Sequence, residues 1–397
     1  MNNSLLTDAF FNRLHSSVLP IEDAETLPPE CYTDSAFYEF EKEALFSHEW
    51  LCAGRESWAA EPGDYFTTSI IGEPIIVVRD RDGVLRAMSA VCQHRAMLVA
   101  EGSGNTRGFV CPYHHWTYAL DGKLVSAPAM DKTCNFDKSE FNLPEFKVEV
   151  WLGFIFIHFD TDAPPLSPRL EAVAEAIAPY DLANTEGPRP EPGTRFEWNW
   201  KVMFENNNDG YHANRLHQGP LHDFVPSRLA SFPELPEGTA GYLRFNGTTH
   251  PDASFNATQK ALFPLFPNLT EERRNQMLFT NIPPTLSLIL SCDMVIYLIV
   301  RADGPETVTM DTGVLFAPGA MADPAFGHRL DMTMSTAMEI MAQDQHVDGL
   351  IQVGLRSRFA KRGRYSWQEG AQRQLNGWLV PRYQACWERL RKQQQVN

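Results

Sequence analysis

Residues 91–118 read VCQHRAMLVAEGSGNTRGFVCPYHHWTY, and this stretch decides how the first half of the chain folds. It holds a Cys-x-His pair, Cys92 and His94, and sixteen residues later a Cys-x2-His pair, Cys111 and His114. Short apolar runs separated by Asp-Gly turn signals surround it, which predicts an all-β module of hairpins. We therefore expect two hairpin loops, each of which presents one thiol and one imidazole to a shared metal centre.

Two metal centres fit this ligand set. A structural zinc ion would take all four ligands in one tetrahedron. A Rieske [2Fe–2S] cluster would place both cysteines on one iron and both histidines on the other. The zinc-finger spacing, with two cysteines close together and two histidines close together, is absent from this stretch. One ligand of each type in each loop favours two irons with two ligands each.

Residues 199–217, NWKVMFENNNDGYHANRLH, carry a second constellation of polar residues. Asp209 and His212 are three residues apart, so on a helix they share a face. His217 follows five residues after His212, a step that implies a π-bulge or a kink. Two histidines and one carboxylate with open coordination positions form the iron site of non-haem Fe(II) oxygenases.

The third ligand of such a site must come from elsewhere in the chain. Residues 328–359 have apolar residues at helical spacing, which predicts one long amphipathic helix. This helix offers three acids, Glu339, Asp344 and Asp348. Periodicity alone does not choose among them. His222 and His346 are near in sequence, but we expect both to be surface or supporting residues.

Charge and composition exclude several classes of function. The chain has 397 residues, with 34 basic against 50 acidic residues and a formal net charge of −16. This argues against nucleic acid and against an anionic membrane as partners. No apolar run is long enough to span a bilayer and no signal peptide is recognisable, so we expect a soluble, cytoplasmic protein. No Gly-x-Gly-x-x-Gly motif follows a strand, so reducing equivalents must come from a separate partner.

Three regions are expected along the chain. Residues 1–46 form a helical segment that packs on the catalytic domain, and residues 47–160 form the all-β module. A Pro-rich stretch, APPLSP at 163–168, follows the module. Residues 161–397 mix runs of strands with runs of helices, which predicts an α+β domain.

Both stretches resemble a known family. Cys-x-His-Arg followed by Cys-Pro-Tyr-His-x-Trp closely resembles the Rieske motif of non-haem iron oxygenases, and the second stretch is similar to the iron motif of their α subunits. These are the oxygenase subunits of the aromatic ring-hydroxylating dioxygenase family. One position departs from the pattern: the residue after the second histidine is often Gly in the family, and here it is His115. The matching residues of the first motif are Cys92, His94, Arg95, Cys111, Pro112, Tyr113, His114 and Trp116.

The resemblance implies specific roles. It puts a Rieske [2Fe–2S] cluster on the four residues Cys92, His94, Cys111 and His114. It puts a mononuclear Fe(II) on His212, His217 and Asp344, because a Gln-Val-Gly-Leu pattern after Asp344 is similar to that of the family's third-ligand helix. Asp209 would be the catalytic acid that links His212 to a cluster histidine of the neighbouring subunit.

The resemblance also implies an architecture and an assembly. The fold would be an all-β Rieske domain joined to an α+β catalytic domain, whose antiparallel sheet is flanked by helices in a helix-grip, START-like manner. The chain would form a homotrimer, or an α3β3 assembly with a small β subunit. Electrons from NAD(P)H would arrive through a separate flavin and iron–sulfur reductase or a ferredoxin.

The implied activity is that of a terminal oxygenase, which uses O2 to hydroxylate a small organic substrate. We favour an aromatic compound, through ring hydroxylation or cis-dihydroxylation. The alternative is a monooxygenase that hydroxylates an N-methyl or O-methyl group, as in the demethylation of a betaine. A Rieske electron-transfer protein or a zinc-binding protein is the alternative of another class, although it leaves the second motif unexplained. The apolar candidates for the substrate pocket are Phe204, Phe224, Phe232, Phe245 and Leu288.

Overall fold

The computed structural model describes residues 5–219 and 221–396, and these form two compact units. One unit consists of residues 47–166. The other combines the segment before residue 47 with everything from residue 167 onward. The change of unit therefore falls within the Pro-rich stretch, at Leu166.

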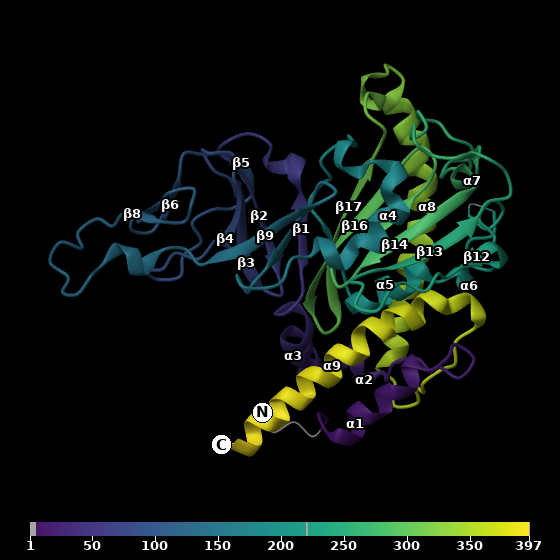
Figure 1. Cartoon of the computed structure of the whole chain (residues 1–397), viewed down its shortest axis with the longest axis horizontal. Helices are drawn as coiled ribbons and strands as arrows, with labels where there is room; N and C mark the ends of the chain where they lie inside the picture. The colour runs from purple at the N-terminus through teal and green to yellow at the C-terminus, as the bar shows by residue number, and fades with distance from the viewer. Residues whose placement is uncertain (1–4, 220, 397) are drawn as a thin grey trace. The chain divides into compact units, whose positions relative to one another are not determined.

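The 47–166 unit is built of antiparallel strands (Figure 1). Its larger sheet has the order β1-β10-β9-β4-β3-β2-β5, and a smaller sheet has the order β6-β7-β8. The strands are β1 (Leu51–Arg55), β2 (Asp64–Ile70), β3 (Glu73–Arg79), β4 (Leu85–Ser89), β5 (Ser103–Asn105), β6 (Phe109–Val110), β7 (Thr117–Tyr118), β8 (Leu124–Ser126), β9 (Glu145–Trp151) and β10 (Phe154–His158).

The turn between β3 and β4 shows how local sequence builds these hairpins. The Oδ1 atom of Asp80 accepts hydrogen bonds from the backbone amides of Asp82 and Val84, both at 2.9 Å. Gly83 takes the left-handed conformation, at φ +80°, that a side chain would disfavour. The Asp-Gly signal thus makes the reversal that it predicts.

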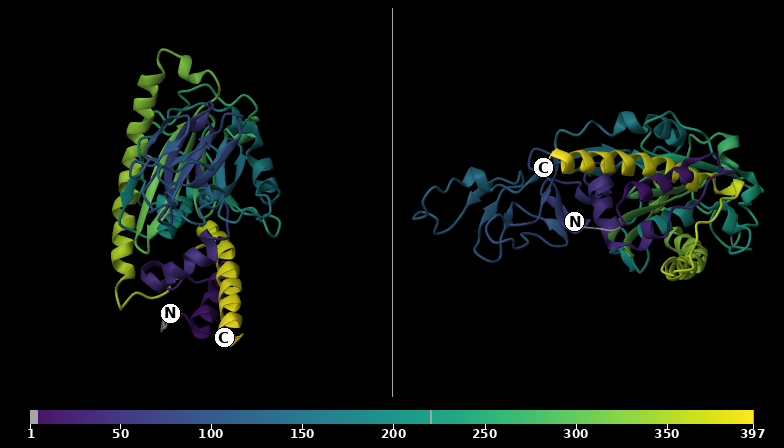
Figure 2. Two further views of the ribbon diagram at one scale, coloured as in Figure 1. Left: turned by 90° about the vertical axis from the view of Figure 1, so that its left-hand side faces the viewer. Right: turned by 90° about the horizontal axis from the view of Figure 1, so that it is seen from below.

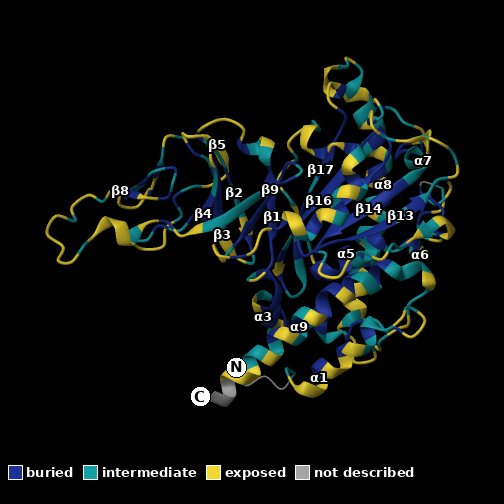
Figure 3. Ribbon diagram, viewed as in Figure 1, coloured by how far each residue is buried: buried dark blue, intermediate teal, exposed yellow. Residues whose placement is uncertain are grey.

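The second unit is centred on a seven-stranded antiparallel sheet with the order β11-β17-β16-β15-β14-β13-β12. Most residues of its central strands are buried (Figure 3), because helices and long loops cover the sheet. The strands are β11 (Thr194–Phe196), β12 (Ala230–Ser231), β13 (Tyr242–Gly247), β14 (Gln276–Ile282), β15 (Leu286–Leu290), β16 (Val295–Gly304) and β17 (Thr307–Leu315).

One long helix, α8, lies along this sheet (Figure 2). It corresponds to the helix expected over 328–359, and its observed bounds are Phe326–Leu355. The other α-helices of the unit are α1 (Asp8–Arg13), α2 (Glu30–Thr33), α3 (Ser35–Glu41), α4 (Glu171–Ile177), α5 (Trp200–Asn208), α6 (Gly210–Ala213), α7 (Glu271–Arg274) and α9 (Gly370–Val396).

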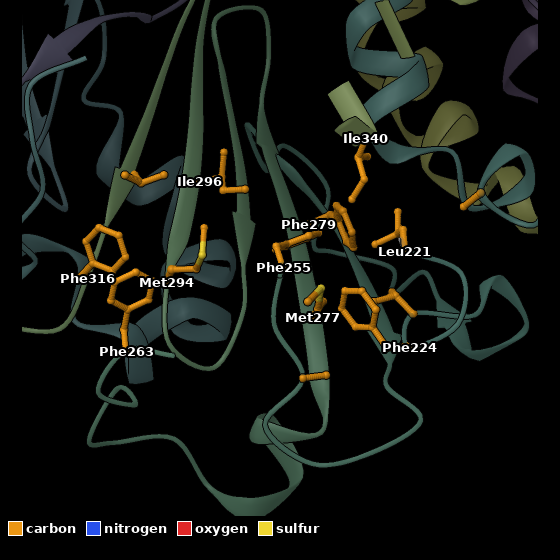
Figure 4. Packing of buried hydrophobic residues seen from close by; sticks show 14 of the residues in the cluster. Leu221, Phe224, Phe255, Phe263, Met277, Phe279, Met294, Ile296, Phe316 and Ile340 are labelled. Carbon is orange, nitrogen blue, oxygen red and sulfur yellow. The ribbon is translucent and has the colours of Figure 1, made fainter. Parts of the chain in front are cut away.

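An apolar core joins α8 to the sheet and to the loop that follows α6 (Figure 4). Ile340 of α8 belongs to the same buried cluster as Phe279 of β14 and Ile296 of β16. Leu221 comes from the loop after α6, so this core ties that loop to the sheet. The functional residues described below lie on the elements that this core holds together.

A buried ion pair anchors the N-terminal segment in the same unit. The Nζ atom of Lys201 on α5 lies 2.7 Å from Oε1 of Glu41 on α3, and both side chains are fully buried. The hydroxyl of Tyr383 on α9 donates a hydrogen bond to the same carboxylate. Helices α3, α5 and α9, which are distant in sequence, therefore meet at the Glu41 carboxylate.

The architecture confirms the predicted α+β class, in which a β-module is followed by an antiparallel sheet flanked by helices. Across residues 5–219 and 221–396, none of the helices is both long enough and apolar enough to cross a membrane.

Candidate metal centres

The two Cys-His loops of the β-module have the same backbone geometry. The amide of Cys92 donates to the carbonyl of Met97, and the amide of Ala96 donates to the carbonyl of Cys92, at 2.8 and 3.0 Å. The amide of Cys111 donates to the carbonyl of Trp116 at 2.8 Å, in the equivalent arrangement. In each loop the hydrogen bonds join residues that are four and five positions apart. The two loops thus share one design, and each presents one thiol from a buried cysteine.

His115 explains the one departure from the family pattern. Its amide donates to the carbonyl of Cys111 at 3.0 Å, so it occupies the place that Ala96 occupies in the other loop. Both residues are left-handed, at φ +59° for His115 and +57° for Ala96. A left-handed position is one that glycine tolerates best. The left-handed conformation of His115 therefore follows from the turn, and its side chain is exposed.

The four predicted cluster residues are brought together. The rings of His94 and His114 are 4.7 Å apart, and His94 stacks on Trp116 at 4.8 Å with an interplanar angle of 10°. Cys92 and Cys111 are both almost fully buried. The two thiols interact with each other and the two imidazole rings are in contact, which suits the two-by-two ligation of a Rieske cluster.

Tyr118 supports one of these thiols, and it was not among the predicted site residues. Its hydroxyl accepts a hydrogen bond from the amide of Gln93 at 3.1 Å and lies 3.3 Å from Sγ of Cys92. The hydroxyl proton is therefore left for the sulfur. Hydrogen bonds to the ligating sulfur are one way in which a protein tunes a cluster's potential. Burial and this sulfur raise the pKa of Tyr118 and keep it a donor.

The second constellation lies where helical structure breaks. Helix α5 begins after Asn199, whose side chain accepts from the amide of Lys201, and it ends at Asn208. Asp209 is extended and caps the short helix α6, which carries His212. His217 lies in the turn beyond α6. Helix α6 ends at Ala213, so the five-residue step from His212 to His217 runs out of the helix into a turn, in place of the π-bulge or kink that the step suggested.

Three donor atoms converge at this break. The Nε2 atoms of His212 and His217 are 3.0 Å apart. The Oδ1 atom of Asp344, on α8, lies 3.4 Å from the first nitrogen and 2.9 Å from the second. Among residues 5–219 and 221–396, these three are the group whose ligand atoms approach closely enough to hold one metal ion.

The spacing of these atoms fits one metal ion. Their separations of 2.9, 3.0 and 3.4 Å are those of donor atoms that could share an ion at the bond lengths of imidazole and carboxylate ligands. Two imidazoles and one carboxylate are the donor set of non-haem Fe(II) oxygenases.

The far side of each imidazole is held by a hydrogen-bond acceptor. The Nδ1 atom of His212 donates to Oδ2 of Asp209 at 3.2 Å, and Nδ1 of His217 donates to Oε1 of Gln343 at 2.8 Å. With the protons on Nδ1, both Nε2 atoms turn lone pairs toward Asp344. Three lone pairs that face one another repel unless a proton or a metal ion lies between them, so this arrangement suits a metal site.

Gln343 was not among the predicted site residues, although it directly precedes Asp344 in the chain. Its role follows from a contact with a residue 126 positions away. Without a metal, the carboxylates dominate the ionisation of this group. Burial lowers the pKa of His212, but hydrogen bonds to Asp209 and Asp344 outweigh it and raise the value to about 9.

The surroundings of the three acids on α8 distinguish between the candidates for the third ligand. Asp344 faces the two histidines, whereas the side chain of Glu339 is exposed. Asp348 is buried one turn beyond Asp344 and accepts a hydrogen bond from Asn206 at 2.9 Å. Burial raises the pKa of Asp348 to about 8.

The two additional histidines lie outside the group of three. His346 is exposed on α8. His222 is partly buried, and its Nδ1 atom finds no hydrogen-bond partner in the part of the chain that the structure describes. Neither belongs to the converging donor atoms.

A cavity of about 930 Å³, its mouth included, opens over these donor atoms. A concave site with mostly apolar walls and a few convergent polar groups is typical of small-molecule binding. Its apolar walls come from three helices and from strands β13 to β17. The described residues that line it are Trp198, Met203, Asn206, Asn207, Asp209, His212, Ala213, His217, Leu221, Arg244, Phe255, Phe279, Ile289, Ile296, Leu298, Met310, Ala337, Ile340, Met341, Asp344, Gln345 and Asp348.

The five apolar residues proposed for the pocket are absent from this lining, so that prediction was wrong. Leu288 shows why: its neighbour Ile289 lines the cavity, and successive residues of a strand point to opposite faces. Phe245 lies next to Arg244 in the same way. Phe204 and Phe224 are fully buried in the core, which is the more common place for an aromatic ring.

Comparison with known families now adds to this geometry. The model of the ring-hydroxylating alpha subunit catalytic domain matches residues 177–385, and that of the Rieske [2Fe–2S] domain matches residues 49–147. The chain belongs to the ring-hydroxylating alpha subunit family. Its N-terminal β-module is thus a Rieske [2Fe–2S] domain, and its α+β unit is the family's catalytic domain, which binds mononuclear iron.

Several members of this family with curated names are similar in sequence. The carnitine monooxygenase oxygenase subunit of Acinetobacter pittii is 38% identical over 207 residues, 49% of this chain and 53% of that protein. The glycine betaine monooxygenase oxygenase subunit of Chromohalobacter salexigens is 34% identical over 201 residues, 50% of this chain and 45% of that protein. The chain spans about half the length of the curated relatives it matches.

Two solved structures of Rieske oxygenases are similar over nearly the whole chain. A quaternary ammonium Rieske monooxygenase, studied for carnitine oxidation by gut microbiota, has a TM-score of 0.77 at 26% identity, covering 91% of this chain and 95% of that one. Naphthalene 1,2-dioxygenase from Rhodococcus sp. has a TM-score of 0.80 at 21% identity, covering 95% and 99%. The second likeness shows the fold alone.

Proposed function

We propose that this chain is the terminal oxygenase of a multicomponent Rieske system and that it hydroxylates a carbon bound to nitrogen in a small quaternary ammonium or betaine-type substrate. The observation that carries the oxygenase activity is the convergence of His212, His217 and Asp344 under a cavity with mostly apolar walls. Those residues, together with Cys92, His94, Cys111 and His114 of the Rieske domain, are the ligands that we assign to the two iron centres.

The relatives favour the nitrogen-containing substrate over the aromatic one that the sequence analysis preferred. The matches named for carnitine and glycine betaine are 38% and 34% identical, and both molecules carry a trimethylammonium group. The naphthalene dioxygenase likeness is 21% identical. The apolar cavity, with Trp198 and Phe255 in its wall, suits methyl groups and offers ring faces to a cation.

An iron ion at this site would bind O2 and pass on the electrons that reduce the O2. The chain's own residues orient the ligands: Asp209 and Gln343 fix which nitrogen of each imidazole faces the metal. The apolar walls keep water away from the reacting carbon. One O2, two electrons and two protons convert a C–H bond to C–OH with release of water. A carbon that bears both OH and nitrogen then loses the amine and leaves as an aldehyde.

Electron supply requires partners. A Rieske cluster held by Cys92, His94, Cys111 and His114 would supply single electrons. We propose that a separate flavin and iron–sulfur reductase or a ferredoxin loads it from NAD(P)H. We further propose that a homotrimer, or an α3β3 assembly with a small β subunit, brings the cluster of one subunit to Asp209 of the next. Such a heterologous interface closes into a ring.

Metal analysis tests the two-centre assignment. Purified protein should hold about three irons per chain, from a two-iron cluster and one further ion. His212→Ala should lower this to about two and leave the visible spectrum of the cluster intact. His346→Ala, an exposed histidine on α8, is the matched control and should keep all the iron. Zinc in place of iron, or loss of both signals in His212→Ala, would contradict the assignment.

Product analysis tests the substrate class. Protein supplied with O2, NADH and a Rieske reductase should release an aldehyde and an amine from glycine betaine, carnitine or choline. Naphthalene and benzoate should give no hydroxylated product. If only the aromatic compounds were oxidised, the proposed substrate class would be wrong and the substrate would be an aromatic compound.

A further inference from the structure

Four residues on neighbouring strands form one row across the sheet beneath the cavity. Arg244 on β13 faces Phe279 on β14, Phe279 faces Ile289 on β15, and Ile289 faces Ile296 on β16. Directly opposed residues on antiparallel strands share a face of the sheet, and all four line the cavity. A charged residue therefore stands at the β13 end of an otherwise apolar row.

Arg244 is buried without a partner charge. Its side chain is 4% exposed, and its guanidinium lies 4.0 Å from the centre of the Phe279 ring. Nη1 donates to the carbonyl of Asn208 at 2.9 Å. Within residues 5–219 and 221–396, Nε has no hydrogen-bond acceptor, and no carboxylate comes within ion-pair distance of the guanidinium. A buried donor left without an acceptor costs free energy.

The acids of the cavity are already engaged. Asp209 accepts from His212 and from the amide of Tyr211, and Asp344 lies between the two histidines. Asp348 is held by Asn206. Burial lowers the pKa of Arg244 to about 10, so the guanidinium remains protonated at neutral pH. Among the described residues, Arg244 is the one lysine or arginine in the lining. The Asp209 carboxylate attracts its charge and opposes the effect of burial, but it forms no direct ion pair with the guanidinium.

The guanidinium also lies close to the start of helix α6. Nη1 of Arg244 is 3.6 Å from the point where a Cβ atom on Gly210 would stand. Gly210 directly follows Asp209 and opens the helix that carries His212. An anion held by Arg244 would thus lie at the edge of the iron site, with the apolar row extending away from it.

We propose that Arg244 binds a carboxylate of the substrate, and that Phe279, Ile289 and Ile296 take the apolar part of the same molecule. A guanidinium pairs with a carboxylate through parallel hydrogen bonds, for which Nε and a terminal nitrogen are suited. This inference rests on the proposed function and narrows it: the substrate is a small amphiphilic acid. Betaine-type acids fit this description, whereas choline, which ends in a hydroxyl, lacks the anion.

Binding to the unaltered, iron-loaded protein is the first test. Glycine betaine and choline share the trimethylammonium group and differ in the carboxylate, so their dissociation constants form a matched pair. Titration calorimetry without reductase should show glycine betaine binding at least about tenfold more tightly, a preference worth about 1.4 kcal/mol. Benzoate against benzamide tests the same anion on an aromatic acid. Equal affinities within both pairs would overturn the proposal, whatever the fate of any variant.

Variants provide the second test. Arg244→Met keeps the apolar stem and removes the charge, so glycine betaine should bind about 30-fold more weakly or worse, as for one lost partner of a buried charge pair. Choline should bind within about twofold of its original affinity. Arg244→Lys keeps the charge but not the planar fork, and should give a smaller loss for glycine betaine. This second variant serves if Arg244→Met fails to fold.

Arg273→Met is the matched control. The Arg273 guanidinium also stacks on a phenylalanine, 4.5 Å from the ring centre of Phe245, but Arg273 is absent from the cavity lining. Its removal should leave glycine betaine binding unchanged. Unaltered binding of glycine betaine in folded Arg244 variants would overturn the carboxylate role.

The failure of this inference can be told from a failure of the proposed function. If carboxylates have no advantage while iron content and O2-dependent product formation hold, the role of Arg244 alone is wrong. If the mononuclear iron is missing, the oxygenase assignment itself is wrong.

Discussion

Oδ2 of Asp209 accepts a hydrogen bond from Nδ1 of His212 at 3.2 Å, while Oδ1 of the same carboxylate accepts the amide of Tyr211 at 2.5 Å. One side chain thus caps helix α6 and orients the imidazole that this helix carries. The cap places His212, and the second oxygen sets its tautomer. The position of the proposed iron ligand and the direction of its lone pair depend on the same residue.

Replacement of this carboxylate separates the two roles. Asn is as good an N-cap as Asp, so Asp209→Asn should keep the fold, the cluster spectrum and the mononuclear iron. Loss of the negative charge behind His212 should lower turnover by about 10- to 100-fold. Asp223→Asn, an exposed acid after the same helix, is the control. Undiminished product in a single-turnover assay of Asp209→Asn would exclude the proposed link to the cluster.

Asp344 is distinguished from its neighbours by an iron assay. Asp344→Asn removes the anionic oxygen that lies 2.9 Å from Nε2 of His217, so the mononuclear iron should be lost and the cluster retained. Glu339→Gln changes an exposed acid on the same helix and should leave the metal content unchanged. If Glu339→Gln lost the mononuclear iron and Asp344→Asn kept it, our assignment of Asp344 as the third ligand would be wrong.

Glu205 predicts a dependence of stability on pH. Burial raises the pKa of this carboxyl, which accepts a hydrogen bond from Tyr32, to about 7. Between pH 4.5 and 7 the folded chain keeps a proton that the unfolded chain releases, so the free energy of unfolding should fall as the pH rises through this window. The loss is at most about 3 kcal/mol.

Urea unfolding at pH 5 and at pH 8 measures this effect. In Glu205→Gln the fall between the two pH values should be smaller than in the unaltered protein, because the amide does not titrate. Glu272→Gln, an exposed position on α7, should reproduce the original fall. Identical pH dependence in all three proteins would show that Glu205 titrates normally.

Loss of one partner of the buried pair of Lys201 and Glu41 should destabilise the protein. Lys201→Met leaves the Glu41 carboxylate buried and unpaired, which should destabilise the protein by about 3–5 kcal/mol. Lys201→Met with Glu41→Leu should recover much of that loss, because no charge is then stranded. The exposed pair Arg195 and Glu197 is the comparison, and Arg195→Met should change stability by about 0.5 kcal/mol or less in urea unfolding.

Local motifs were predictable because their chemistry depends on neighbours in sequence. The Cys-x-His and Cys-x2-His loops contain the turns that present their own ligands, with left-handed residues at Ala96 and His115. The α+β class followed from runs of strands and helices. The end of α6 at Ala213 was less predictable, since a helix that ends between His212 and His217 and a π-bulge both satisfy a five-residue step.

The three acids on α8 show what helical periodicity cannot predict. Asp344 and Asp348 differ by about 40° around the helix, while Glu339 and Asp344 differ by about 140°, at 100° per residue. This arithmetic says which acids share a face. It does not say which face meets His212 and His217, because that depends on how α8 packs on the sheet.

The amino-acid sequence by itself determined the family, the two iron motifs and the order of the elements, because these rest on spacing within short segments. Only the tertiary structure decided which strand faces line the cavity, that Gln343 supports His217 across 126 positions, and that Arg244 begins a row with Phe279 and Ile289. Strand parity and register come from pairing between distant segments, and one residue of shift turns every side chain to the opposite face.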